Sequence, residues 1–186
     1  MSRRWQQIHM GFAAAMILAL ASLAGVQSAQ AATATSSASA SITSQVRHSL
    51  AILPWYGVFD NLAFQVNGTE VTLMGQLTSE HAVTKEDAEN AVRHIPGVTS
   101  VTNQIEVLPP SMFDNQIRRA EYRTVFSQGD LGRYTMGALP QVRIVVKNGH
   151  VTLEGVVMNQ MDKAMAGIFA NTVPGVFSVT NNLQID

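Results

Sequence analysis

Apolar residues in the first half of the chain repeat with two different periods, and each change of period marks the end of an element. Between residues 42 and 53 the large apolar residues lie three or four positions apart. This spacing predicts an amphipathic helix, and Pro54 is expected to stop it. Residues 62–66 and 71–77 have the composition of strands. Asn67-Gly68 between them favours a hairpin, because both residues tolerate a positive φ.

A second helix and a third strand complete this pattern. Ser79 is expected to cap the helix at its N-terminus, and Pro96-Gly97 is expected to end it, with Gly97 in the left-handed conformation. Alternating apolar positions then predict a strand over residues 98–107. The order of elements is αββαβ. The second helix, of about 15 residues, is long enough for a crossover between parallel strands.

Two motifs occur twice in the chain, in the same order. The first is Asn-Gly followed by Val-Thr-Leu-x-Gly, and it ends at Gly75 and again at Gly155. The second is Pro-Gly-Val-x-Ser-Val-Thr-Asn, which contains Gly97 and again Gly175. We infer a tandem duplication and predict an α+β fold of two tandem αββαβ modules, each a three-stranded mixed sheet with two helices packed on it. The predicted domains are residues 44–108 and 112–186, joined by a linker at 109–111.

The two copies are expected to differ in their loops. Thr69-Glu70 lengthens the hairpin of the first copy by one residue, and residues 127–139 add to the segment before the first strand of the second copy. The glycines inside strands, Gly75 and Gly155, predict a bulge or the close approach of a helix. The residues predicted to face the core from the last helix are Met161, Met165, Ile168, Phe169 and Val173. A module of this size buries only roughly 60% of its unfolded surface, so we expect the two modules to dock into one unit.

The N-terminal residues have the features of an export signal. Arg3-Arg4 precede an apolar stretch over residues 11–26, and Ala29-Gln30-Ala31 forms a small-x-small cleavage site. This order predicts a signal peptide over residues 1–31, a periplasmic location, and a flexible leader of small residues at 32–43. An uncleaved anchor helix is the alternative, although the stretch is short for a membrane span of about 20 apolar residues.

The repeated motifs, with a lysine and spaced alanines on the helix between them, resemble the BON domain, a module found in bacterial envelope proteins. The resemblance covers residues 44–108 and 112–186, nearly all of the chain after the signal segment. It implies an αββαβ fold in tandem copies, a periplasmic or outer-envelope location, and no catalysis. It also implies interaction with phospholipid or with envelope proteins, often in osmotic stress or envelope maintenance.

Charge is distributed unevenly between the copies. Residues 44–108 carry 3 basic and 7 acidic residues, whereas residues 109–186 carry 7 and 6. The first helix of the second copy interleaves basic and aromatic residues, and the predicted lipid-binding residues are Arg118, Arg119, Tyr122, Arg123 and Phe126. A cationic helix with aromatic residues can rest on anionic lipid headgroups. The alternatives are that the aromatic residues belong to the core while the arginines are solvated or paired with Glu121 and Asp114, or that this face binds a protein.

The sequence contains no recognisable catalytic constellation. The histidines after the signal segment have no second metal ligand at helical spacing, and the chain has neither a cysteine nor a G-x-S-x-G motif. We therefore expect a binding protein, with no enzymatic activity, metal, cofactor or nucleic-acid partner. The alternative function is a protein–protein adaptor in the cell envelope, which would use either an exposed sheet edge or the aromatic loop after the first helix. Trp55 and Tyr56 in this loop are the predicted partner-binding residues.

Overall fold

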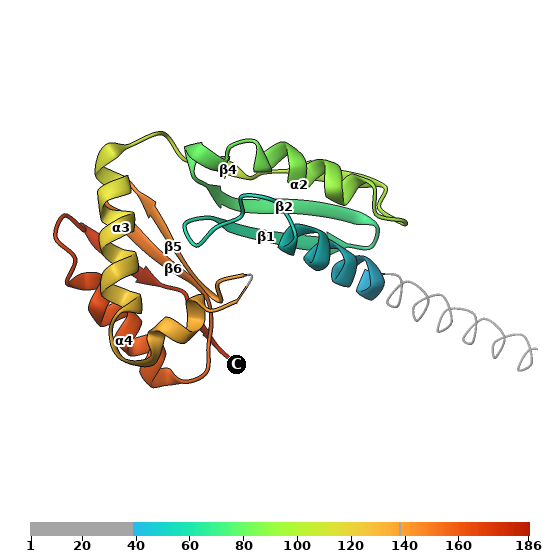
Figure 1. Ribbon diagram of the computed structural model, residues 1–186. Helices are drawn as coiled ribbons and strands as arrows, with labels where there is room; N and C mark the ends of the chain where they lie inside the picture. The colour runs from blue at the N-terminus through green and yellow to red at the C-terminus, as the bar shows by residue number, and fades with distance from the viewer. Residues whose placement is uncertain (1–38, 138) are drawn as a thin grey trace, which may run out of the picture.

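The computed structural model describes residues 39–137 and 139–186, which form two αββαβ modules arranged in tandem (Figure 1). This confirms the predicted α+β fold of two tandem modules. The predicted signal peptide, residues 1–31, lies outside the described residues. Among the residues that the structure describes, no helix has both the length and the apolar character needed to cross a membrane.

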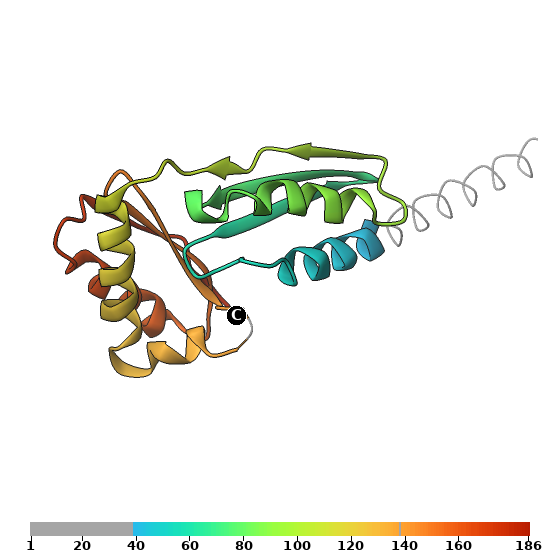
Figure 2. The same ribbon diagram turned by 45° about the horizontal axis from the view of Figure 1, so that its top comes forward.

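The first module packs a helix over residues 39–51 and a second helix against one face of its sheet. Its further elements are β1 (Asn61–Asn67), β2 (Glu70–Leu77), a 3-10 turn η1 (Ser79–His81), α2 (Thr84–Arg93), β3 (Ser100–Asn103) and β4 (Glu106–Val107). β1 is antiparallel to β2, while β3 and β4 are two pieces of one strand parallel to β2. Figure 2 shows this strand along one edge of the sheet, and Figure 1 shows helix 39–51 in front of β1, on the same face as α2. Val71, Leu73 and Leu77 of β2 share one buried cluster with both helices.

The second module repeats this plan with one addition. Its elements are α3 (Met112–Phe126), a 3-10 segment η2 (Gly129–Thr135), β5 (Val142–Lys147), β6 (His150–Val157), α4 (Gln160–Asn171), β7 (Ser178–Asn181) and β8 (Gln184–Ile185). The sheet has the same order and directions as the first. The residues added in this copy form η2, whose Leu131 and Tyr134 are buried in the core. The insertion therefore enlarges the core of the second module as well as its loop.

The glycines inside the second strands occupy equivalent places in the two modules. Gly75 has φ +118° and Gly155 has φ +124°. A Cβ at Gly75 would lie 2.0 Å from the carbonyl oxygen of Asn61, and one at Gly155 would lie 1.9 Å from that of Gln141. The close approach predicted at these positions is real, but it comes from the backbone that enters the neighbouring strand and not from a helix. This matched geometry supports the inferred duplication.

Three expected boundaries are wrong. Residues 39–43, predicted as the end of the flexible leader, are helical, because Ile42 is buried and packs over Gly97. Ser79 does not cap α2, which begins at Thr84 without a side-chain cap; Ser79 starts η1 instead. The hairpin of the first copy is not longer than that of the second. Each turn encloses two residues. In the first copy Asn67 is still part of β1 and pairs with Glu70, whereas in the second copy the equivalent Asn148 lies within the turn at φ 53°.

The apolar face of α4 is rotated from its predicted position. Met161 is 74% exposed and Ile168 is also exposed, whereas Ala166 and Ala170 are buried against the sheet. Small residues on this face let the helix approach the strands closely, and the amide of Asn181 lies against Gly167. Met165 and Phe169 pack at the margin of the core, and Val173 is buried as predicted.

Candidate functional site

The two modules meet where residues 54–60 of the first module, which we call the junction loop, lie against the second module. The N–H of Ile144 donates to the carbonyl of Val58 over 2.8 Å. The guanidinium of Arg143 donates to the carbonyl of Gly57 over 3.0 Å. The side chains of Val58 and Phe59 pack against the core of the second module. The modules are therefore docked, as their small size led us to expect.

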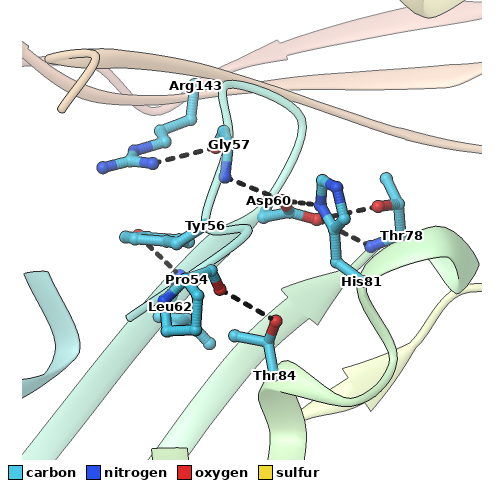
Figure 3. Close-up of polar contacts among 9 residues, drawn as sticks. All are labelled: Pro54, Tyr56, Gly57, Asp60, Leu62, Thr78, His81, Thr84 and Arg143. Carbon is cyan, nitrogen blue, oxygen red and sulfur yellow. Dashed lines mark hydrogen bonds and ion pairs between the residues drawn. The ribbon is translucent and has the colours of Figure 1, made fainter. Parts of the chain in front are cut away.

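One buried carboxylate, that of Asp60, fixes the shape of the junction loop (Figure 3). Its Oδ1 accepts hydrogen bonds from the backbone N–H and the hydroxyl of Thr78, at 2.8 and 3.0 Å. Its Oδ2 accepts from the N–H of Gly57 at 3.0 Å and lies 2.6 Å from Nδ1 of His81. Because the carboxylate is fully satisfied, it can be buried without the large cost of an unpaired charge.

Tyr56 and Arg143 form a second link across the junction. The Arg143 guanidinium lies 4.1 Å from the centre of the Tyr56 ring, a cation–π contact. The Tyr56 hydroxyl accepts the N–H of Leu62 over 3.1 Å. Burial raises the pKa of Tyr56 and lowers the pKa of Arg143 from their ordinary values, and the attraction between the two groups opposes both shifts. Tyr56 thus lies inside the junction.

Trp55, predicted together with Tyr56 to bind a partner, points to solvent. Its side chain is 71% exposed and its backbone has φ +66°, a left-handed conformation that is uncommon for a residue other than glycine. The structure therefore separates the two aromatic residues into a half-buried one at the junction and an exposed one.

A hollow of about 530 Å³ opens beside the junction loop, and its lining combines apolar and cationic side chains. The residues that line it are Val58, Phe59, Arg119, Tyr122 and Arg123. Tyr122 packs edge to face against Phe59, with ring centres 6.3 Å apart. Three of the five predicted lipid-binding residues thus meet on one surface, together with two residues of the first module. We call this surface the junction groove.

The two arginines of the junction groove have no acidic partner among the residues that the structure describes. Arg119 and Arg123 are exposed, and the Nε of Arg123 donates only to the carbonyl of Arg119, over 3.1 Å. By contrast, Lys147 pairs with Glu106 over 2.6 Å, and Arg133 pairs with Asp162. The groove is therefore a local concentration of uncompensated positive charge.

The remaining two predicted lipid-binding residues, Arg118 and Phe126, do not belong to this surface. Arg118 is 4% exposed, and its guanidinium donates to the carbonyl of Val146 and to the side chain of Asn115, both over 2.6 Å. Phe126 is buried in the core of the second module. Arg118 lies on the buried side of α3, whereas Arg119 and Arg123 lie on its outer side. The charge of these residues alone does not reveal this difference.

The acidic residues predicted as alternative partners of the arginines have other surroundings. Asp114 accepts the N–H groups of Asn148 and Gly149, over 3.0 and 2.8 Å, and so holds the second hairpin turn. Glu121 is completely buried, and neither of its carboxyl oxygens has a hydrogen-bond partner within the described residues. Burial raises the pKa of Glu121 to about 8.

Sequence reasoning did not predict the burial of Glu121, the role of Asp60 or the contact of Val58-Phe59 with the other module. A signal existed for Glu121, because it lies midway between Ile117 and Val125 at four-residue spacing on the buried stripe of α3. No local pattern showed that Val58-Phe59 packs on the other module, since this contact depends on how the modules are arranged. The described residues also contain no cluster of three histidines or acidic residues able to hold a metal ion.

Comparison with known proteins gives one family match. The BON domain family matches residues 38–109 and 136–186. The second matched segment begins after α3, so the match does not itself include Arg119 or Arg123. No curated protein matches the chain.

Two of the solved structures similar to the chain come from Chlamydia trachomatis. One is CdsD, described as a structural protein of the type III secretion system, with 12% identity, 78% of this chain and 93% of that chain covered, and a TM-score of 0.30. The other is the C-terminal domain of CdsD, with 11% identity, coverage of 76% and 96%, and a TM-score of 0.26. Scores this low carry no argument about fold or function.

Proposed function

We propose that this chain, which belongs to the BON domain family, binds the surface of anionic phospholipids through the junction groove. Membership of this family, whose domains are of a non-catalytic binding type, indicates an envelope or periplasmic binding module. The observation that carries the finer proposal is the pair of unpartnered arginines beside the apolar side chains of the groove. We further propose export by a cleaved signal peptide and a role in envelope maintenance or osmotic stress.

The charge of the groove suits a phosphate headgroup. Arg119 and Arg123 lie one helical turn apart on the outer side of α3, and among the described residues no carboxylate lines the groove. Guanidinium groups bind phosphate oxygens through strong charge-assisted hydrogen bonds. A polyanionic surface would be attracted to this position, and salt would weaken the attraction.

The apolar side chains of the groove suit the part of a lipid next to its headgroup. Phe59 and Tyr122 present aromatic rings beside the arginines, and Tyr122 is 39% exposed. Aromatic residues favour the boundary between headgroups and acyl chains, because they combine an apolar body with a polar edge or group. The arrangement of cations and aromatic rings matches the layered chemistry of a bilayer surface.

Co-sedimentation with vesicles tests the proposal. The purified protein should bind vesicles that contain phosphatidylglycerol and release them as salt is raised, and it should ignore vesicles of phosphatidylcholine alone. Arg119→Glu with Arg123→Glu should weaken binding by about 30-fold or more, since each lost cation is worth about 1 kcal/mol near an anionic surface. Tyr122→Ala should weaken binding with less effect on its salt dependence.

A charge-matched control separates the groove from a general effect of net charge. Arg47→Glu with Arg93→Glu changes the net charge by the same amount at exposed positions of the first module, and it should leave binding almost unchanged. Equal losses in the two double variants would refute a specific site. Failure of the unmodified protein to bind anionic vesicles at low salt would refute the function.

A protein–protein adaptor is the second candidate function, favoured by the exposed and strained Trp55. Backbone strain at an exposed aromatic residue is a reason to suspect a binding role. Trp55→Ala should then abolish capture of an envelope protein while Arg119→Glu with Arg123→Glu does not. Capture that survives Trp55→Ala would remove this loop from consideration.

A further inference from the structure

The two modules carry equivalent edge strands, β1 and β5, and only one of these edges is occupied within the described residues. Each strand pairs on one side with the next strand of its hairpin. The other side of β5 receives the carbonyl of Val58 and the guanidinium of Arg118. On the corresponding side of β1, the described residues provide one hydrogen bond, from the N–H of Leu62 to the Tyr56 hydroxyl.

The register of the hairpin fixes which backbone groups face this free edge. Asn67 pairs with Glu70 across a two-residue turn, so alternate residues counted back from Asn67 exchange hydrogen bonds with β2. Leu62, Phe64 and Val66 therefore direct their N–H and C=O groups away from the sheet. The equivalent residue to Phe64 in the other module is Ile144, whose N–H points outward and bonds Val58.

The core side chains of the two edge strands also differ, because those of β5 are more deeply buried than those of β1. On β5 the inward residues Val142, Ile144 and Val146 are 1%, 0% and 0% exposed. Their counterparts on β1, which are Leu62, Phe64 and Val66, are larger or equal in size and remain only half-buried. The second module gains its cover from η2 and from the junction loop, and the first module has neither at this edge.

We propose that the edge of β1 pairs with β1 of a second copy of this chain, in an antiparallel arrangement about a two-fold axis. The strand reads NLAFQVN and contains no charged residue and no proline. Charged residues and prolines are what proteins normally use to protect an exposed edge. An isologous contact requires a surface that complements itself, and an uncharged strand meets this condition without repulsion. Centring the pair on Phe64 places Phe64 opposite its own counterpart and Ala63 opposite Gln65, and it continues both cores across the axis. The Tyr56 hydroxyl, which accepts the Leu62 N–H, marks one end of the paired segment.

This register predicts which side chains face each other on the outer side of the joined sheet. Ala63 of one copy lies opposite Gln65 of the other, and both side chains are exposed in the single chain. Ala63→Lys with Gln65→Lys would place two lysines opposite two lysines. Ala63→Lys with Gln65→Glu would instead create two attractive pairs. Like charges directly opposite in a sheet destabilise it, and opposite charges stabilise it.

Sedimentation equilibrium over a wide range of protein concentration tests the proposal. The unmodified protein should form a dimer, the double-lysine variant should weaken its association by about tenfold or more, and the lysine–glutamate variant should associate at least as well as the unmodified protein. Thr102→Lys with Gln104→Lys, which adds the same charge near the opposite edge of the sheet, should leave association unchanged. Far-UV circular dichroism checks that each variant keeps its fold.

The measured association state and the effect of the two variants on it decide whether the chain pairs through β1. A protein that stays monomeric at every concentration overturns the proposal and leaves the β1 edge to a strand from a different protein. A dimer that the double-lysine variant does not weaken, or that the lysine–glutamate variant does not restore, overturns the β1 pairing. This test is independent of the proposed lipid function, because it is read without vesicles and none of its substitutions lies in the junction groove.

Discussion

Glu121 should make the stability of the protein fall as the pH rises through neutrality. Its carboxyl group is 0% exposed and has no hydrogen-bond partner within the described residues, so the folded protein retains the proton up to a pKa of about 8. The unfolded chain releases this proton near the ordinary value of 4.5. Between these two pH values the folded state binds one more proton than the unfolded state, and folding is therefore favoured by acid.

The size of the effect follows from this difference in pKa. The free energy of unfolding should fall by about 1.4 kcal/mol per pH unit across this window because of Glu121 alone. At pH 7 the loss relative to pH 4.5 should be about 3 kcal/mol, a large fraction of the total stability of a domain. Below the unfolded pKa the full stability is present, and above the folded pKa no further loss arises from this group.

Glu121→Gln tests this reasoning, because the amide has a similar shape and does not titrate. Urea unfolding, followed by far-UV circular dichroism at steps between pH 5 and 8, should give a steeper loss for the unmodified protein than for the variant. The two should be about equally stable near pH 5, and the variant should be several kcal/mol more stable at pH 8. Other titrating groups affect both proteins equally, so the difference isolates Glu121. Parallel pH profiles would show that the carboxyl is ionised in the folded protein and would refute the argument.

Two further predictions concern the backbone of the fold. Asp60→Ala should destabilise the protein by about 3 kcal/mol, because it leaves buried N–H groups of Gly57 and Thr78 without a partner; an unchanged urea midpoint would contradict this role. Gly155→Ala should cost about 3 kcal/mol, since its Cβ would collide with a backbone oxygen at a positive φ. Gly129→Ala is the control, because it has a positive φ with no atom within 4 Å and should cost about 1 kcal/mol. Equal losses at the two glycines would refute the collision.

The fold was predictable because its signals are local and occur twice. The hairpins, the glycines at 75 and 155 and the turns at Pro96-Gly97 and Pro174-Gly175 each follow from a short stretch of sequence. Where prediction failed, the outcome depended on a distant residue. Ser79 does not cap α2, and the residue before it, Thr78, is instead held through its N–H by Asp60, which is far away in sequence.

The candidate site was predictable only in part, for a similar reason. Periodicity identified α3 and its basic residues, but the choice between Arg118 and Arg119 depends on the rotation of the helix against the sheet. Two of the apolar residues of the junction groove, Val58 and Phe59, lie in the other module. A sequence pattern within one module cannot show a surface that exists only after two modules have docked.

The junction loop also imposes an order on assembly. A ribosome completes the first module before the second, and Val58 and Phe59 then have no core to enter, because their neighbours in the finished protein have yet to be made. During that interval the nascent chain exposes a short apolar segment. A chaperone could shield it, and a fragment that ends at the linker would keep it permanently, which makes such a truncation prone to aggregate even if its own sheet is intact.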